Sequence, residues 1–280
     1  MKMRRWATGS ATYVFLIALL IIMIYPLVWM FMATFKTNEE IFRSVALFPQ
    51  SWSLDAFING WQGNRQITYS TFFLNSFKLV IPTVLATVVS SSLVAYGFAR
   101  FRFRLKRVLF SLVIGALLLP HEVLIVPQYL IFRNLGWIDS YWPFIVPAAL
   151  ACYPFFIFML VQFFRGFPRE LEEAAIIDGC GSMGIFLRII VPLSKPALIS
   201  VALFQFVWRW NDFLNSLIYI NTTSKFTVPL ALRMSLDISG MVNWNSLLAM
   251  SLLAICPLII VFIFSQKYFV EGIVTTGIKG

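Results

Sequence analysis

Six long apolar stretches constrain the fold of this chain more than any other feature of its sequence. A transmembrane helix needs about 20 predominantly apolar residues to cross the ~30 Å hydrocarbon core of a bilayer. Hydrophobic residues make up 60% of the 280 residues and charged residues only 12%, which is too apolar for a soluble domain. The sequence therefore predicts an all-α, polytopic membrane protein with about six transmembrane helices, over residues 12–33, 72–98, 108–131, 142–164, 197–220 and 246–268.

The basic residues indicate how these spans are oriented. Most of the 22 Lys and Arg residues fall in segments that face the cytoplasm if the N-terminus is cytoplasmic, so the positive-inside rule favours cytoplasmic N- and C-termini. Lys2, Arg4 and Arg5 precede the first apolar stretch as they would in a signal peptide. That stretch is longer than a signal core and no small-residue cleavage site follows it, so we expect a retained helix.

The formal net charge of the chain is +10, and its basic residues are most concentrated in the run from Arg100 to Arg107, where aromatic and basic residues alternate. Such a run could bind nucleic acid in a soluble protein. Here it forms a short turn between two spans, so we interpret it as a topological anchor. We expect membrane lipid, and no nucleic acid, among the partners. Cys152, Cys180 and Cys256 lie far apart in the sequence and are interpreted as reduced packing residues.

The sequence lacks the motifs that would give the chain a catalytic chemistry of its own. It has no G-x-x-x-x-G-K-[ST] phosphate loop, so we do not expect it to hydrolyse ATP alone. His121 and Glu122 begin a zinc-protease motif, but Ile125 stands where the second histidine is needed. The sequence around Ser182 is one glycine short of a nucleophile elbow. We therefore expect no enzyme, no catalytic residue, no cofactor and no metal in this chain.

The whole chain, 1–280, is expected to be a single transmembrane domain with one polar cytoplasmic loop, at about 165–196. In this loop Pro168 suits a first helical turn, acidic residues follow it, and Gly179 can adopt the left-handed conformation that ends helices. A short helix over 168–178 is predicted. Four of its residues form one face, which two alanines make narrow enough to dock into a groove. They are Leu171, Ala174, Ala175 and Asp178.

The rest of this loop is predicted to continue as a rigid helical bracket. Ser182 can cap a second short helix that ends before Pro192. Pro196 lies where the first turn of the fifth span should begin. The other soluble segments are two outer loops, at about 34–71 and 221–245, and a short inner tail.

The inner loop resembles a known motif. Glu173-Ala174-Ala175, Gly179, Ile189 and Pro192 match the spacing of the EAA loop, E-A-A-x3-G-x9-I-x-L-P, of ATP-binding-cassette importer permeases, with Val191 in place of the leucine. Further segments extend the resemblance to MalG-like permeases of carbohydrate importers. They are Asn75-Ser76-Phe77, the run from Ala95 to Arg100, the run from Trp210 to Phe213, and the run from Gln266 to Gly272.

This resemblance implies a permease subunit that imports sugars, with oligosaccharides as the first expectation, by alternating access in a bacterial cytoplasmic membrane. It implies a second, homologous permease, two copies of a cytoplasmic ATPase that bind ATP and magnesium, and an extracytoplasmic sugar-binding protein. The inner loop would couple the permease to the ATPase, and the second outer loop would reach into the binding protein. The coupling residues would be Glu173, Ala174, Ala175, Asp178, Gly179 and Pro192.

Charged side chains within a span are costly and usually mark a cavity or an ion pair. Glu122, Arg209 and Asp212 are the candidates. Spans three and five both run from the inside to the outside in this topology, so Glu122 and Arg209 both lie ~18–21 Å from the cytoplasmic edge, at a rise of about 1.5 Å per residue. We hypothesise that these two approach each other or line a shared polar cavity. Arg209 with Asp212, three residues further on, is the competing pair.

The segment around Arg209 carries the groups that bind neutral sugars, namely aromatic faces, a guanidinium, an amide and a carboxylate. We assign it to the translocation path. Its residues are Trp208, Arg209, Trp210, Asn211 and Asp212. The alternative is that Trp208 and Trp210 pack between helices while Asn211 and Asp212 stabilise a bend.

Three other functions compete with sugar import. A secondary transporter would need coupling-ion sites and often an inverted repeat, and no such repeat is evident. A membrane scaffold or receptor would not need charged residues at mid-membrane. An importer permease of the same architecture for a non-sugar solute is opposed only by the sugar-type resemblance outside the inner loop.

Overall fold

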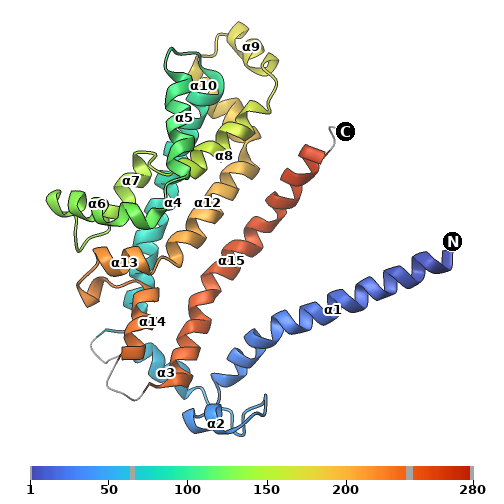
Figure 1. Cartoon of the computed structure of the whole chain (residues 1–280), viewed down its shortest axis with the longest axis vertical. Helices are drawn as coiled ribbons and strands as arrows, with labels where there is room; N and C mark the ends of the chain where they lie inside the picture. The colour runs from blue at the N-terminus through green and yellow to red at the C-terminus, as the bar shows by residue number, and fades with distance from the viewer. Residues whose placement is uncertain (1, 64–66, 238–241, 278–280) are drawn as a thin grey trace. The chain divides into compact units, whose positions relative to one another are not determined.

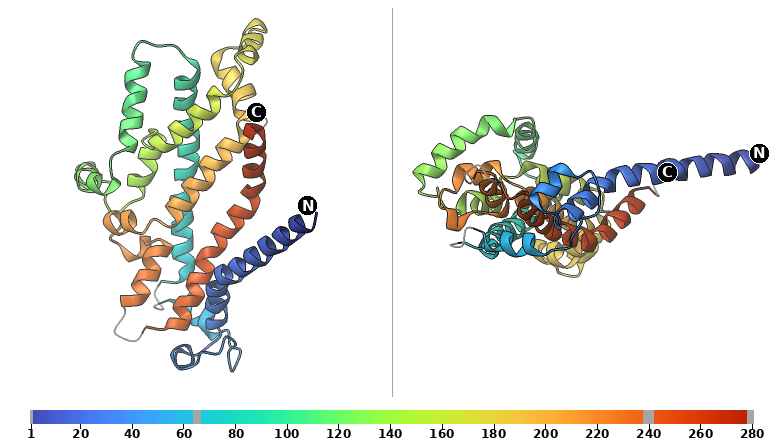
Figure 2. Two further views of the ribbon diagram at one scale, coloured as in Figure 1. Left: turned by 45° about the vertical axis from the view of Figure 1, so that its right-hand side comes forward. Right: turned by 90° about the horizontal axis from the view of Figure 1, so that it is seen from below.

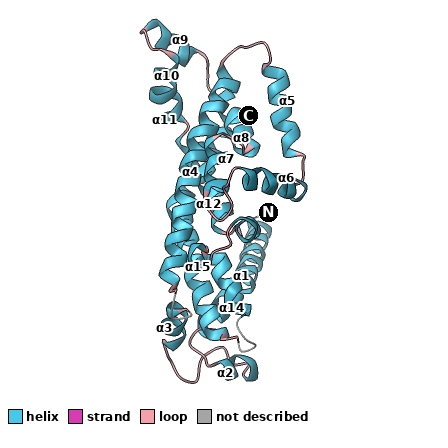
Figure 3. Cartoon of the chain, turned by 90° about the vertical axis from the view of Figure 1, so that its left-hand side faces the viewer, coloured by secondary structure: helices cyan, strands magenta, loops and turns pink. Residues whose placement is uncertain are grey.

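The computed structural model describes residues 2–63, 67–237 and 242–277, with side chains described over 12–63, 67–236 and 242–268 (Figure 1). Within these ranges the secondary structure is helical and contains no strand (Figure 3), which confirms the predicted all-α class. The chain divides into two compact units, which are described separately. One comprises residues 1–70 and 231–256, and the other comprises residues 71–230 and 257–280.

Candidate membrane spans agree in number with the sequence. Four helical segments are long and apolar enough to span a bilayer in the described part of the chain. They lie in α1 (Lys2–Ala33), in α4 (Tyr69–Arg100), in α7 (Trp142–Ala149) with α8 (Pro154–Arg165), and in α15 (Trp244–Gly277). Two bent pairs bring the total to as many as six: α5 (Lys106–Leu117) with α6 (His121–Asn134), and Ser182–Leu193 with α12 (Lys195–Trp210). The cytoplasmic location of the termini stays a prediction.

The third expected span, 108–131, is wrong as a single helix. α5 ends at Leu117, α6 begins at His121, and the two helix axes differ by 106° (Figure 2). Pro120 lies in the break with extended backbone angles of −60° and 131°. A proline lacks the N–H that would continue the hydrogen bonds of α5, and it disfavours helical geometry in the residue before it. Apolar composition alone did not reveal this bend.

The fifth expected span, 197–220, is also wrong as a single helix. α12 begins at Lys195, with Pro196 in its first turn as predicted, and ends at Trp210. The six-residue α13 (Leu214–Tyr219) follows after a break. The Asn211 amide donates to the Val207 carbonyl over 2.9 Å at the end of α12, and Asp212 Oδ1 accepts from the backbone N–H of Asn215 over 3.2 Å. These contacts fit the alternative in which Asn211 and Asp212 stabilise a bend.

Small hydroxyl residues allow α4 to pack closely in the second unit. Thr83 and Thr87 are fully buried, and each donates to the carbonyl four residues earlier in the helix. Ser90 instead donates across to the carbonyl of Ala148 in α7, over 2.5 Å. Helices approach closely in membranes where such residues replace bulky ones. The hydrogen bond from Ser90 thus fixes α7 against α4.

The first unit contains α1, α2 (Asn38–Arg43) and α3 (Asp55–Gln62) with the beginning of α15. Polar contacts join the segment around the start of α2 to the segment around the start of α15. Asn38 Nδ2 donates to Asn243 Oδ1 over 2.9 Å, and Asn245 Nδ2 donates to the Lys36 carbonyl over 3.1 Å. The described side chains of α1 from Thr12 to Leu27 are exposed around the helix, as expected of a span that faces lipid.

The remaining helices are short. They are α9 (Glu170–Ile177), α10 (Ser182–Ile185), a π-helix (Phe186–Ile190), α11 (Val191–Leu193), a 3-10 turn (Thr223–Lys225) and α14 (Val228–Asp237).

Candidate functional site

The inner-loop helix α9 (Glu170–Ile177) forms where the sequence predicts it, slightly shorter than the expected 168–178. Three acidic residues stand in its first turn, where they complement the positive end of the helix dipole. Gly179 has a φ of 82°, which confirms the predicted left-handed end. The N–H of Gly179 bonds the Ile176 carbonyl over 3.0 Å, and the N–H of Cys180 bonds the Ala175 carbonyl over 2.9 Å. α9 lies at the same end of the second unit as the α4–α5 turn (Figures 1 and 3).

The exposed face of α9 differs from the predicted one. Ala175 is only 7% exposed and belongs to the hydrophobic core around Phe164 and Phe186, so its assignment to the docking face is wrong. Glu173, Ala174, Asp178 and Gly179 are exposed as expected. Ile176 and Ile177 are exposed as well, Ile177 by 86%. These two residues were not predicted as part of the docking face, although an apolar pair at the end of a polar helix is a visible signal of a binding surface.

An ion pair joins α9 to the end of α4. Arg100 Nε lies 2.9 Å from Glu172 Oε1, at an angle that does not make a hydrogen bond. Arg100 Nη2 also donates to the Phe167 carbonyl over 3.0 Å. The Tyr96 hydroxyl donates to the Ser182 carbonyl over 3.2 Å, which attaches the following segment too. Arg100 was interpreted only as a topological anchor, because nothing in the sequence pairs it with a residue 72 positions away.

The segment after α9 is helical but not as predicted. Ser182 is the first residue of α10 rather than its cap, and the helix runs past Pro192 to Leu193 instead of ending before it. Residues Phe186–Ile190 form a π-helix, in which the N–H of Val191 bonds the Phe186 carbonyl five residues earlier. A π turn is wider than an α turn and often occurs at functional sites. It accommodates Pro192, whose ring would clash with a regular preceding turn.

Arg209 forms its ion pair with Asp212, the competing partner considered above. Its guanidinium carbon lies 5.6 Å from the centre of the Phe144 ring and 5.2 Å from that of Tyr153, within range of cation–π attraction. Asn215 Nδ2 donates to both carboxylate oxygens of Asp212, over 2.9 and 3.1 Å. The charge of Arg209 is thus compensated locally, by a neighbour in its own broken helix.

Glu122 does not occupy the expected position in mid-helix. It lies exposed in the first turn of α6, directly after the break at Pro120. The depth predicted for Glu122 requires a continuous helix over 108–131. The 106° bend between α5 and α6 rules out such a helix, so the predicted depth does not hold. Its neighbour His121 contacts the segment after Arg209, because His121 Nε2 lies 3.2 Å from Asn215 Oδ1.

The two tryptophans pack among aromatic rings. Trp210 is buried and its ring lies 4.9 Å from that of Phe77 and 5.6 Å, stacked, from that of Phe206. Trp208 is half exposed, with its ring 5.2 Å from each of Phe155 and Phe156. These contacts fit the alternative of packing between helices. A role for Trp208, Trp210 and Asn211 in the translocation path stays a prediction.

A cavity of about 340 Å³ lies beside Arg209, within the second unit. Its wall is largely apolar and includes the aromatic rings of Phe132, Phe144 and Tyr153. Four polar side chains other than tyrosine reach it: His121, Gln128, Arg209 and Asn215. The hypothesis that Glu122 and Arg209 approach each other or line a shared polar cavity is therefore wrong, because Glu122 does not line this largely apolar cavity, whereas its neighbour His121 does.

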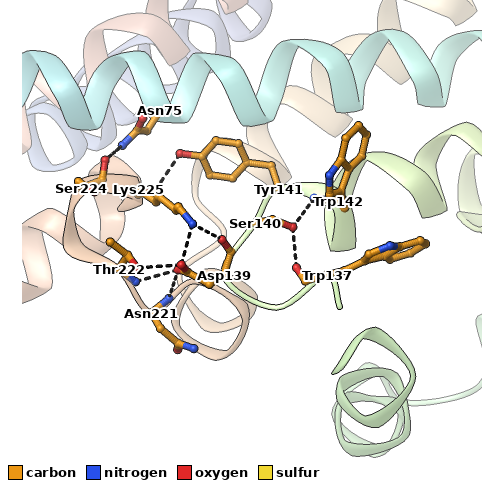
Figure 4. Close-up of polar contacts among 10 residues, drawn as sticks. All are labelled: Asn75, Trp137, Asp139, Ser140, Tyr141, Trp142, Asn221, Thr222, Ser224 and Lys225. Atoms are coloured by element: carbon orange, nitrogen blue, oxygen red, sulfur yellow. Dashed lines mark hydrogen bonds and ion pairs between the residues drawn. The ribbon is translucent and has the colours of Figure 1, made fainter. Parts of the chain in front are cut away.

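Two loops at the other end of the second unit are fastened together through Asp139 (Figure 4). Its carboxylate accepts from the Lys225 ammonium over 2.7 Å and from the backbone N–H groups of Asn221 and Thr222 over 3.0 and 2.8 Å. The Tyr141 hydroxyl donates to the Lys225 carbonyl over 2.9 Å. These contacts, the Asp139 clamp, were not predicted from the sequence, since an isolated Asp in a loop is not a specific signal.

The hydrogen bond from Lys225 is the main cause that holds the pKa of Asp139 well below its ordinary value, and the N–H groups of Asn221 and Thr222 act in the same direction. Partial burial of the carboxylate opposes them. Burial, together with the charge of Asp139, raises the pKa of Tyr141 to about 12. The clamp therefore holds a stable carboxylate and a neutral phenol at neutral pH.

The comparison with known proteins decides the family. A family model described as the binding-protein-dependent transport system inner membrane component matches residues 87–274. The chain belongs to this permease family. The matched region covers α9, the cavity and the Asp139 clamp.

Relatives of this permease share nearly its whole length. It is 37% identical to the probable ABC transporter permease protein YurM of Bacillus subtilis (strain 168), over 99% of this chain and 91% of the relative. It is 35% identical to the arabinooligosaccharides transport system permease protein AraQ of Halalkalibacterium halodurans, over 92% of each. The chain is thus a permease subunit of an ATP-binding-cassette transporter and a multi-pass membrane protein, and it is not itself an enzyme.

A solved structure shares the fold of this permease. It is a chain of a bacterial ABC transporter involved in the import of the acidic polysaccharide alginate, with a TM-score of 0.84 and 21% identity. The match covers 94% of this chain and 96% of the other. Over the described residues of this permease, no cluster of three metal-ligating side chains occurs.

Proposed function

We propose that this permease imports neutral oligosaccharides across a bacterial cytoplasmic membrane, by alternating access driven by separate ATPase subunits. The substrate class is supported by the relative that transports arabinooligosaccharides, which aligns over 92% of the chain. Two copies of a cytoplasmic ATPase bind ATP and magnesium, a homologous permease completes the pathway, and an extracytoplasmic binding protein delivers the sugar. N- and C-termini are cytoplasmic.

The exposed face of α9 is the observation that carries the coupling role. Ile177 is 86% exposed at the end of this helix, next to the exposed Glu173 and Ala174. An apolar patch rimmed by polar side chains is typical of a protein–protein contact. In this proposal the loop 165–196 docks on the ATPase through α9. Gly179 and Pro192 shape the loop without touching the partner.

The contacts of Arg100 give this docking a mechanical consequence. Because Arg100 pairs with Glu172 and holds the Phe167 carbonyl, a displacement of α9 is passed to the end of α4. α4 packs against α7 through Ser90 and Ala148, so the displacement reaches the broken helices that surround the cavity. The breaks after Leu117, Ala149 and Trp210 then serve as hinges.

The proposal is tested by reconstituting the permease with its partner permease, ATPase and binding protein in proteoliposomes and measuring sugar-stimulated ATP hydrolysis. Wild type is expected to respond to neutral oligosaccharides. Glu173→Arg is expected to abolish the response while the complex still assembles, with Glu170→Arg as a matched exposed control. Stimulation that survives Glu173→Arg would contradict the coupling role, and a response only to a non-sugar solute would favour the same architecture with another cargo.

A further inference from the structure

We propose that the head group of an anionic phospholipid binds between the α4–α5 turn and the end of α8, at the end of the second unit where α9 lies (Figures 1 and 3). Four basic side chains would surround its phosphate: Arg102, Lys106, Arg165 and Arg169. The ligand is a component of the membrane and not the transported solute. The inference depends on the location of these residues at a membrane surface, and it is independent of the proposed sugar import.

The fold gathers these four cations from two distant parts of the chain. Arg102 and Lys106 belong to the α4–α5 turn and the start of α5, whereas the other two lie at the end of α8 and directly before α9. α5 packs against α8, and the guanidinium carbon of Arg165 lies 4.9 Å from the centre of the Phe110 ring of α5. The charges that act on Lys106 are those of the three arginines. Like charges repel, so an anion bound among them would stabilise the cluster.

The protein itself supplies no anion to this cluster. Among the described residues, none of the four cations forms an ion pair with a carboxylate, and the nearby Glu172 pairs with Arg100 instead. The three arginines are exposed and Lys106 is partly exposed, so a ligand can reach them. Lys106 Nζ donates to the Phe101 carbonyl over 2.8 Å, which leaves two of its three N–H groups for a ligand. Guanidinium groups bind phosphate oxygens strongly, often through two N–H groups at once.

The cluster lies at the ends of candidate membrane spans. The span in α4 ends at Arg100, the span in α7 with α8 ends at Arg165, and α5 begins at Lys106. Lipid phosphates lie directly outside the hydrocarbon core, which is where span ends lie. Basic pockets between membrane helices typically bind the head groups of anionic lipids. The depth of the cluster therefore matches that of a lipid phosphate.

An apolar row on α5 can contact the acyl chains of the same lipid. Leu105, Leu109 and Leu112 are spaced i, i+4, i+7, so they share one side of the helix, and they are 42–64% exposed. The row begins next to Lys106. A phospholipid would use both the cations and this row, whereas a free phosphate ion or a nucleic acid would use the cations alone. The combination therefore favours a lipid.

The first test measures retained lipid on the assembled importer by native mass spectrometry, in a detergent mixture of phosphatidylglycerol and phosphatidylcholine. Each cation near a lipid surface contributes about fivefold to affinity, so Lys106→Gln with Arg165→Gln should weaken the site about 25-fold. Wild type should then retain one phosphatidylglycerol more than this variant at concentrations that fill the wild-type site. Retention of phosphatidylcholine should not differ.

A charge-matched control separates a built site from general attraction. Arg188→Gln with Lys195→Gln removes the same charge from exposed positions of the same inner loop. This control should retain as much phosphatidylglycerol as wild type. A second variant of the cluster, Arg102→Gln with Arg169→Gln, should lose the same lipid as the first, so the site is tested even if one variant fails to assemble.

The second test compares unfolding temperatures of the purified importer. Phosphatidylglycerol should raise the unfolding temperature of wild type above its value in phosphatidylcholine, because a ligand of the folded state stabilises it by mass action. The gain should be absent from both variants of the cluster and present in the control. Inorganic phosphate at the same concentration should have no effect.

Equal losses of phosphatidylglycerol from the cluster variants and the control would overturn the site and indicate general attraction to a basic surface. Unchanged retention in the cluster variants would overturn it as well. Stabilisation by inorganic phosphate as large as that by phosphatidylglycerol would overturn a lipid as the occupant. Absence of sugar-stimulated ATP hydrolysis would overturn the proposed function and leave this inference standing.

Discussion

Arg100 and Glu172 form a buried ion pair, with 2.9 Å between Nε and Oε1, across 72 residues of sequence. The Arg100 side chain is only 4% exposed and that of Glu172 16%. A charged pair so well enclosed is held rigidly, and it lies where the inner loop meets the end of α4. It is therefore the contact through which α9 and the membrane-spanning part of the second unit move together.

Removing either side chain of the Arg100–Glu172 ion pair should weaken the contact between α9 and α4 by more than the loss of one charge–charge attraction. Loss of one member of a buried ion pair costs about 3–5 kcal/mol, because the other charge stays buried without compensation. We expect Glu172→Gln to lower the thermal stability of the purified permease and the amount of sugar transported per ATP. Glu170→Gln, at an exposed position of the same helix, should change neither.

Charge exchange provides a stricter version of this experiment. Arg100→Glu and Glu172→Arg should each impair coupling, and the double variant should recover part of it, since the pair is restored in reverse. Additive losses in the double variant would show that the two side chains act independently. The readout is the ratio of transport to ATP hydrolysis in proteoliposomes.

The neighbouring alanines of α9 should respond differently to the same substitution. Ala175→Leu forces three extra carbon atoms into a packed core and should cost about 1–3 kcal/mol of stability. Ala174→Leu adds them on the exposed face, so stability should be retained while association with the ATPase weakens. Thermal unfolding in detergent and co-purification of the ATPase distinguish the two effects. Equal destabilisation by both changes would contradict the assigned faces.

The end of α9 depends on the backbone of Gly179. With a φ of 82°, a side chain there costs about 1–2 kcal/mol in strain, even though no atom lies within 4 Å of the Cβ position. We expect Gly179→Ala to lower the unfolding temperature and coupling. Gly181→Ala is the control, because Gly181 also has open space but a φ of −73°. A neutral result at both positions would argue against a strained helix end.

The Asp139 clamp should persist in mild acid. The folded pKa of Asp139 lies below its ordinary value of 3.8, so the carboxylate contributes stability above that value and loses it only as pH falls through the lower, folded pKa. The difference in unfolding temperature between wild type and Asp139→Asn should stay constant from pH 8 to about pH 5, because titration of an ordinary Asp is confined to about pH 4 and below. A difference that vanishes near pH 6 would mean that another group controls the loops.

The sequence predicted what depends on composition and local geometry. Apolar length located the spans, Gly179 marked the end of α9, and the EAA spacing led to the family. The helix breaks at Pro120 and after Trp210 were not predicted, because hydropathy gives the length of an apolar segment but not a change in the direction of the helix axis. Ala175 was misassigned because a small residue suits either close docking or close packing, and only the fold distinguishes them.

The polar pairs were harder to predict for a different reason. Asp139 with Lys225, and Arg100 with Glu172, join residues far apart in the chain, and single sequences carry no record of such distances. Arg209 offered two candidate partners, and the break after α12 favoured the local one, Asp212.

The break between α5 and α6 also determines which neighbours this permease can have. Leu118, in the break, is 80% exposed, and the helix ends beside it leave backbone carbonyls and N–H groups without helical partners. In hydrocarbon each such group would cost several kcal/mol, so irregular backbone within a membrane span is tolerated only against protein or water. A break inside a span therefore needs protein or water beside it rather than lipid, despite the leucines that surround it.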